Sequence, residues 1–575
     1  MKKRGNQNGN AKVNRHDEAQ DRRENQESRG GGDVHGRLPC GEALEVREAG
    51  LHLPPHGEAP YCARGDKQGR GQDEERLRAR RHGGGGPGLD KGVQARPEDP
   101  QGGERHGGAA CEDGRPRRPC RRPKEEEPGI NDGDLSRVIT HFFPKMHRWL
   151  DSLADPRQQG KVVYPLRLLV LAVLLQRLSG SPSGRRLEDD KRGRPLLLDN
   201  LNSIAGTRME YIPHSDTIKH LMEGLRPCEL EGVLVQMASR LIRSRVLDCM
   251  RVRGVKRLEG CFLVAVDGVT VHTSRRRLEH SIHRASRDGE REYMVAKLQA
   301  SLVCDGRIRI PLMAESIENE AEYDKQDCEL KAAGRLLERL KAAFPRTRFV
   351  ILLDGLYLCE RVLDICRRSK WHYSITINEG ASAFLDKAER ALEADGRRVF
   401  RGDDPRTGLS REVSYANGLK HSFGDTEFTL NAIRMKTQGC KLLYAVSAHV
   451  HKDEAAALLD AVSRRRWQIE EQFKVDKRHG LELEHAFGNT GNAAHNFYLV
   501  AQLAQTCLEL MLHSGLFRRL QMMQNRDRIT RVIDAPMLEW YRSIAVVMDR
   551  LRVSLMTRPL SDIDMTGWRL GFSSA

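Results

Sequence analysis

The stretch that decides the fold runs from Cys261 to Gly268 and reads CFLVAVDG. Six consecutive apolar residues are typical of a strand that is buried on both faces of a sheet. A second stretch repeats the pattern, because the apolar run 349–353 (FVILL) is followed by Asp354 and Gly355. One Asp-Gly pair after a strand is most often only a turn. Two of them in one α/β unit indicate a shared site, since ligands gather at the carboxyl ends of strands in open α/β sheets.

The segments around these two stretches predict further strands and helices, and the order of these elements is typical of a known fold. The pattern predicts strands at 296–304 and 307–313, a helix at 322–344, a helix at 357–368 and a strand at 371–377. With the two apolar stretches, the order becomes strand, strand, strand, helix, strand, helix, strand. This order predicts a ribonuclease-H-like core with a mixed sheet.

Short alternating segments follow within residues 395–450, and they are separated by Asn417-Gly418 and Gly424-Asp425. They predict a small antiparallel β insertion between the last core strand and a final helical region. The fold class is therefore α/β, a ribonuclease-H-like mixed-sheet core that is interrupted by a β insertion and has helical N-terminal and C-terminal parts.

This pattern divides the chain into six segments. They are a disordered tail (1–128), a helical N-terminal domain (129–255), the first part of the catalytic core (256–394), the β insertion (395–450), the final helix region of the core (451–515) and a C-terminal helical region (516–575). The helical domain carries Arg240, Arg243 and Arg245, so it either binds DNA or simply packs on the core.

The tail is set apart by its composition. The first isoleucine of the chain is Ile130, and no Phe or Trp precedes it. Such a segment buries too little apolar surface to offset the entropy lost on ordering, so we expect disorder. The other interpretation is a wrongly assigned start of translation.

Charge and cysteine usage narrow the class of protein. The chain of 575 residues has 96 Lys+Arg against 80 Asp+Glu, a net charge of +16, which favours a polyanionic partner. Its 13 cysteines contain no C-x-x-C pair and are expected to be reduced, as in the cytoplasm.

The most apolar run, 164–178, contains Pro165, Arg167 and Arg177 and is shorter than the roughly 20 apolar residues of a membrane span. It predicts a buried helix, and we expect no membrane association.

A third carboxylate comes from the run RRRWQIEEQFKVDK, which begins at Arg464. At about 100° per residue, Arg466, Glu470 and Lys477 fall on one side of a helix. Such a stripe is often only a solvated face. Together with Asp267 and Asp354, however, Glu470 makes three hard oxygen ligands, and such ligands suit Mg²⁺ or Mn²⁺.

These residues resemble a family. The chain is similar to bacterial insertion-sequence transposases of the cut-and-paste class, which have a ribonuclease-H-like core, an Asp-Asp-Glu triad and a β insertion before the Glu. Their signature Tyr-x2-Arg-x3-Glu-x6-Lys is matched in register by Arg466, Glu470 and Lys477, with Ser463 at the position of the Tyr. Trp467 fits an Arg-Trp-x-Ile-Glu variant of the signature. The resemblance extends over roughly residues 135–515.

The resemblance implies roles for the matched residues. Asp267, Asp354 and Glu470 would bind two metal ions, Mg²⁺ or Mn²⁺, and act as the catalytic triad. Arg466 and Lys477 would contact phosphates of the transposon end. Trp467 would stack on distorted DNA, or would be a core aromatic under the helix. Because Ser463 replaces the Tyr, one phosphate contact of the family is in doubt.

The function that follows is cleavage of transposon ends and their joining to target DNA by two-metal-ion phosphodiester transfer. The alternatives are a metal-dependent nuclease on the same core without strand transfer, and a catalytically inactive DNA-binding protein. The expected partners are double-stranded DNA, as terminal inverted repeats and target, and a second copy in a homodimeric DNA complex. The expected location is the bacterial cytoplasm, at the nucleoid.

Overall fold

The computed structural model describes residues 133–180, 194–286, 289–304, 308–318, 328–377, 383–394, 399–478 and 490–513, with single residues between 480 and 488 and between 544 and 552. The predicted tail of residues 1–128 lies outside the described residues. So do almost all of the predicted C-terminal region 516–575 and the start of the predicted helix 322–344.

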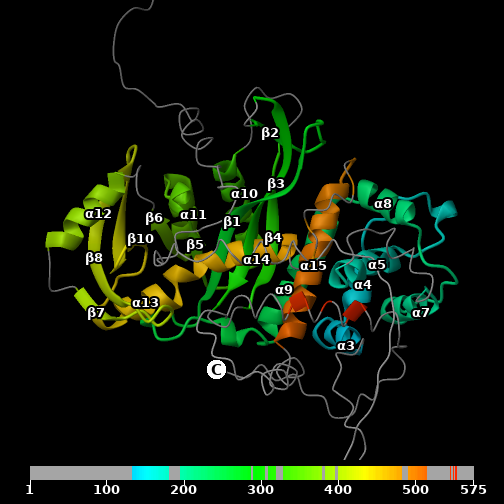
Figure 1. Ribbon diagram of the computed structural model, residues 1–575, viewed down its shortest axis with the longest axis horizontal. Helices are drawn as coiled ribbons and strands as arrows, with labels where there is room; N and C mark the ends of the chain where they lie inside the picture. Colours follow the sequence, from blue (N-terminus) through cyan, green and yellow to red (C-terminus); the bar gives the residue numbers. More distant parts are fainter. Residues whose placement is uncertain are drawn as a thin grey trace, which may run out of the picture. The chain divides into compact units, whose positions relative to one another are not determined.

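A mixed sheet forms the centre of the structure (Figure 1). Its strands are β1 (Phe262–Ser274), β2 (Ile282–Ala285), β3 (Arg291–Val303), β4 (Ile310–Ile317), β5 (Phe349–Leu353), β6 (His372–Ile377), β7 (Val399–Asp403), β8 (Ser410–Phe423), β9 (Thr426–Thr437) and β10 (Cys440–Val446). The order across the sheet is β2-β3-β1-β5-β6-β10-β9-β8-β7, with β4 beside β3. β3 is antiparallel to both β1 and β4, whereas β1, β5 and β6 are parallel. This arrangement of β4, β3, β1, β5 and β6 confirms the predicted ribonuclease-H-like fold class.

Helices cover both faces of the sheet. After the N-terminal helices come α10 (Glu329–Ala343), α11 (Glu360–Ser369), α12 (Ala383–Ala394), α13 (Ala455–Ala461), α14 (Trp467–Arg478) and α15 (Ala493–Leu512). The 3-10 turns are η1 (Gln159–Lys161), η2 (Asp248–Met250), η3 (Lys256–Leu258), η4 (Gly355–Tyr357), η5 (Lys452–Glu454) and η6 (Ser463–Arg466).

Side chains alternate between the two faces of the sheet, so each strand contributes to two hydrophobic cores. Val264 of β1 and Ile351 of β5 belong to the core that contains α10 and α11. Ala265 and Leu352, the neighbouring residues in the two strands, belong to the other core, together with Ile469 of α14. Since side chains two residues apart in a strand share a face, Asp267 and Asp354 lie on the α14 face.

The N-terminal helices pack around α15. They are α3 (Gly133–Phe142), α4 (Met146–Asp151), α5 (Leu166–Leu178), α7 (Arg194–Ala205), α8 (Ser215–Gly224) and α9 (Pro227–Arg243). α15 contacts α3, α5, α8, α9 and the strand β4, and α9 also contacts β4. Figure 1 shows α15 between the sheet and the helices α5 and α8. α5 is largely buried, as the apolar run 164–178 predicted. Among the described residues, no helix is both long and apolar enough to cross a membrane.

Three local predictions need correction. β1 does not end at Asp267 but continues to Ser274, so Asp267-Gly268 is no turn. Asn417-Gly418 lies inside β8, at a register shift opposite β9, with Gly418 in the left-handed region at φ 76°. The strands of the predicted insertion also extend the core sheet, because β10 pairs antiparallel with β6.

Candidate active site

The two aspartates lie at the same level on neighbouring parallel strands. In the β1–β5 ladder Ala265 pairs with Leu352, and each aspartate follows two residues later in its own strand direction. Neighbouring strands are about 4.8 Å apart, so this register sets Asp267 beside Asp354. Asp354 directly follows β5 and caps η4, where its Oδ1 accepts a hydrogen bond of 2.9 Å from the Leu356 backbone N–H.

Glu470 lies on α14, which packs on β1 and β3. The side chain of Arg466 connects Glu470 to Asp267 of the sheet. Its Nη2 donates to Glu470 Oε1 at 2.6 Å, and its Nη1 donates to Asp267 Oδ2 at 3.1 Å. Arg466 itself is the last residue of the turn η6 and not part of α14, which corrects the prediction that all three signature residues lie on one helix.

The pKa values of Asp267 and Glu470 are raised. Burial raises the pKa of Asp267 to about 7; the Arg466 charge lowers it, while the charges of Glu470, Asp354 and Glu329 raise it further. Burial also raises the pKa of Glu470, against the charge and hydrogen bond of Arg466. The site therefore holds an excess of negative charge.

The donor atoms are of a type that suits divalent metal ions. Carboxylate oxygens are the ligands that Mg²⁺ and Mn²⁺ prefer, and bound cations would offset both the burial and the mutual repulsion that raise the pKa values of Asp267 and Glu470. In the part of the chain that the structure describes, no three Asp, Glu, His or Cys side chains are grouped closely enough to hold a metal. The guanidinium of Arg466 lies between Asp267 and Glu470 instead.

The remaining signature residues lie on or before the same helix. Trp467 is half-buried at the start of α14, with Lys474 Nζ 5.8 Å from its ring centroid. Lys477 is half-buried one turn beyond Lys474. Ser463 is 2% exposed, and Ser374 of β6 donates a hydrogen bond of 2.8 Å to its Oγ. The Ser463 side chain is therefore buried against β6 and is not exposed at the surface.

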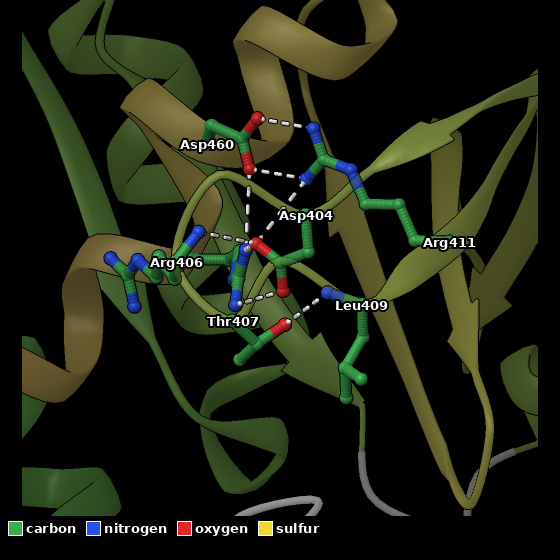
Figure 2. Close-up of polar contacts among 7 residues, drawn as sticks. Asp404, Arg406, Thr407, Leu409, Arg411 and Asp460 are labelled. Atoms are coloured by element: carbon green, nitrogen blue, oxygen red, sulfur yellow. Dashed lines mark hydrogen bonds and ion pairs between the residues drawn. The ribbon is translucent and has the colours of Figure 1, made fainter. Parts of the chain in front are cut away.

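The first arginine of the run has a structural role. Arg464 donates to both carboxylate oxygens of Asp404, at 2.7 and 3.0 Å. Figure 2 shows the neighbouring pair, in which Arg411 of β8 holds both oxygens of Asp460 on α13, each at 2.6 Å. These contacts connect the β7–β8 turn to the segment that leads into Arg466.

A fourth carboxylate was not singled out from the sequence. Glu329 begins α10, and its carboxylate packs against Gly268, where a Cβ would lie 2.6 Å from Glu329 Oε1. The signal in the sequence is Gly268 itself, which the pattern places at the end of a strand and which lies inside β1.

Comparison with known proteins matches a domain to the segment that contains these residues. Residues 263–507 match the family model of the transposase DDE domain, a segment that contains Asp267, Asp354 and Glu470 and is less than half of the chain. The matched segment thus has the sequence pattern of that domain. None of the curated proteins compared with the chain matches it.

Among solved structures, the chain is similar to the piggyBac transposase in a synaptic complex with hairpin DNA. The sequences are 9% identical, the similarity covers 75% of this chain and 84% of that chain, and the TM-score is 0.31. A TM-score this low does not establish a shared fold, so the strand order and register define the fold.

Proposed function

We propose that this protein is a DNA transposase that cleaves the ends of a mobile element and joins them to target DNA. The observation that carries the proposal is the bridge that Arg466 forms between Asp267 and Glu470, which are far apart in the chain. Asp267 lies on β1, and Asp354 directly follows the neighbouring parallel strand β5 at the same level. All of them fall in the segment that matches the transposase DDE domain.

In this proposal Asp267, Asp354 and Glu470 hold two Mg²⁺ or Mn²⁺ ions. When bound, two such ions activate the attacking oxygen and stabilise the leaving oxygen of a phosphodiester transfer. The chain supplies the carboxylate ligands on or beside rigid elements, with Asp267 on the central strand β1, Asp354 directly after β5 and Glu470 on α14. Rigid support keeps the ligands in place for each step.

In this proposal, side chains near the site bind the carboxylates and the DNA. Arg466 is 13% exposed and already binds two carboxylates, so in the metal-free protein it keeps Asp267 and Glu470 together. A phosphate contact by Arg466 belongs to the complex with DNA and metal. Lys477 binds a phosphate of the end DNA as a point charge, and Trp467 stacks on DNA that is distorted near the cut.

The finer class follows from the signature. Arg466, Glu470 and Lys477 with the preceding strands support a bacterial insertion-sequence transposase of the cut-and-paste class, active in the cytoplasm on its own terminal inverted repeats. We propose a homodimer in the DNA complex, so that each copy acts on one end. The buried Ser463 is compatible with this class if another residue makes the phosphate contact of the family Tyr.

The test uses the full chain, a labelled duplex with the end of its own element, a target plasmid and Mg²⁺. Wild type is expected to cut at the end and to join the cut 3′ strand to the plasmid. Asp267→Asn and Asp354→Asn should do neither, whereas Glu471→Gln, a neighbour on α14, should do both. Cutting without joining would support the nuclease alternative. Cutting by Asp267→Asn at the wild-type rate would contradict the proposal.

A further inference from the structure

We propose that Glu329 is a fourth acidic residue of this site, which positions the Asp267 strand and strengthens metal binding by the triad. The inference rests on the proposed function. Glu329 is the first residue of α10, on an element that supplies none of the three triad acids.

Its first contact explains Gly268. A Cβ at this position would lie 2.6 Å from Glu329 Oε1 and 3.1 Å from its Cδ, so the carboxylate fills the space of a side chain. Gly268 pairs with Leu298 inside the β1–β3 ladder, and its φ is not in the left-handed region. The glycine therefore leaves room for the Glu329 carboxylate, which a Cβ would displace, and it does not form a turn.

The second contact reaches the other aspartate. Tyr357, fully buried in η4, donates a hydrogen bond of 3.1 Å from its hydroxyl to Glu329 Oε2. Tyr357 follows Asp354 by three residues, and the Asp354 carboxylate caps the same turn. One carboxylate thus contacts the residue after Asp267 with one oxygen and the turn after Asp354 with the other.

A simpler role is stabilisation of α10, since an acid in the first turn of a helix favours the helix dipole. That role needs neither a glycine at 268 nor a buried hydroxyl donor. The two contacts tie the Glu329 carboxylate to the residue after Asp267 and to the turn after Asp354, so Glu329 fits a positioning residue of this site better than a bare helix terminus.

The experiment measures Mn²⁺ binding to the full chain by isothermal titration calorimetry, and end cleavage in Mg²⁺ and in Mn²⁺. Glu329→Gln keeps the size of the side chain and removes its charge. We expect about 10- to 100-fold weaker Mn²⁺ binding and slower cleavage in Mg²⁺, as for other residues that orient metal ligands. Cleavage should recover in part in Mn²⁺. Glu338→Gln, exposed on the same helix, should match wild type in both measurements.

Two further variants test the same inference if Glu329→Gln folds poorly. Tyr357→Phe removes one hydroxyl and should cause a smaller loss of Mn²⁺ affinity, and Gly268→Ala should displace the carboxylate and cause a loss like that of Glu329→Gln. Wild-type Mn²⁺ affinity in all three variants would overturn the inference. If Asp267→Asn abolishes cleavage while Glu329→Gln cuts as wild type, only this inference fails. If Asp267→Asn also cuts as wild type, the proposed function fails.

Discussion

Arg466 and Asp267 form an ion pair with 3.1 Å between Arg466 Nη1 and Asp267 Oδ2, although 199 residues separate them in the chain. The other terminal nitrogen of Arg466 binds Glu470. One side chain therefore fixes the third acid relative to the first. Its guanidinium lies between the two carboxylates, where its positive charge offsets their negative charges when no metal is bound.

Replacing Arg466 by Ala should leave two half-buried carboxylates without their shared partner. We expect the free energy of unfolding in EDTA to fall by about 1–3 kcal/mol. Mg²⁺ should restore more stability to Arg466→Ala than it adds to wild type, because a cation can replace the lost charge. Urea unfolding with EDTA and with Mg²⁺ measures both effects. Equal stability of variant and wild type in both conditions would show that the contact has no such role.

The Asp404 contacts should matter for stability and not for chemistry. Asp404 is 2% exposed, and Asp404→Ala leaves Arg464 and Arg411 with the single carboxylate of Asp460 between them, so one positive charge is uncompensated at a cost of about 3–5 kcal/mol. Its exposed neighbour Asp403 is the control, and Asp403→Ala should unfold like wild type. Thermal and urea unfolding provide the measurement. A loss for Asp403→Ala as large as that for Asp404→Ala would contradict the assignment.

Asp476 should make stability depend on pH. Burial raises the pKa of this fully buried side chain on α14 to about 7, although the Gln502 hydrogen bond and the Arg309 charge oppose the shift. The folded state then binds one more proton than the unfolded state between about pH 4 and 7, so stability falls as pH rises through this range. Asp476→Asn should remove roughly 2–4 kcal/mol of that dependence and be more stable than wild type at pH 8.

The measurement is urea unfolding of both proteins between pH 4 and 8. Other titrating groups cancel in the difference between them. A difference that does not change with pH would mean that Asp476 is ionised in the folded protein at pH 5 already.

Much of the fold could be predicted from local pattern. The strand at 349–353 has the predicted bounds, and the apolar run 164–178 contains the buried helix α5, because continuous apolar runs specify buried elements. What local pattern does not contain is the partner of a residue far away in the chain. The sequence predicts that a strand ends at Gly268, because Glu329, which packs against this glycine inside β1, comes from another element. For the same reason, nothing near Ser463 indicated its buried contact with Ser374.

Lys477→Ala should weaken binding of the end DNA almost equally for all sequences, because a phosphate contact carries no sequence information. The slope of log Kobs against log salt should become shallower by roughly one. Fluorescence anisotropy across a salt series measures the slope. An unchanged slope would exclude Lys477 from the phosphate contacts.

The central claim is that Glu470 binds metal for DNA cleavage and does not serve to bind DNA. Glu470→Gln keeps the shape and the hydrogen-bonding capacity of the side chain but removes the charge that holds a cation. The most direct measurement is cleavage of end DNA in Mg²⁺ by this variant, with end binding measured on the same preparation and Glu471→Gln as control. The account predicts no cleavage with nearly unchanged binding. Cleavage at the wild-type rate in Mg²⁺ would contradict it and leave Glu470 as an ordinary partner of Arg466.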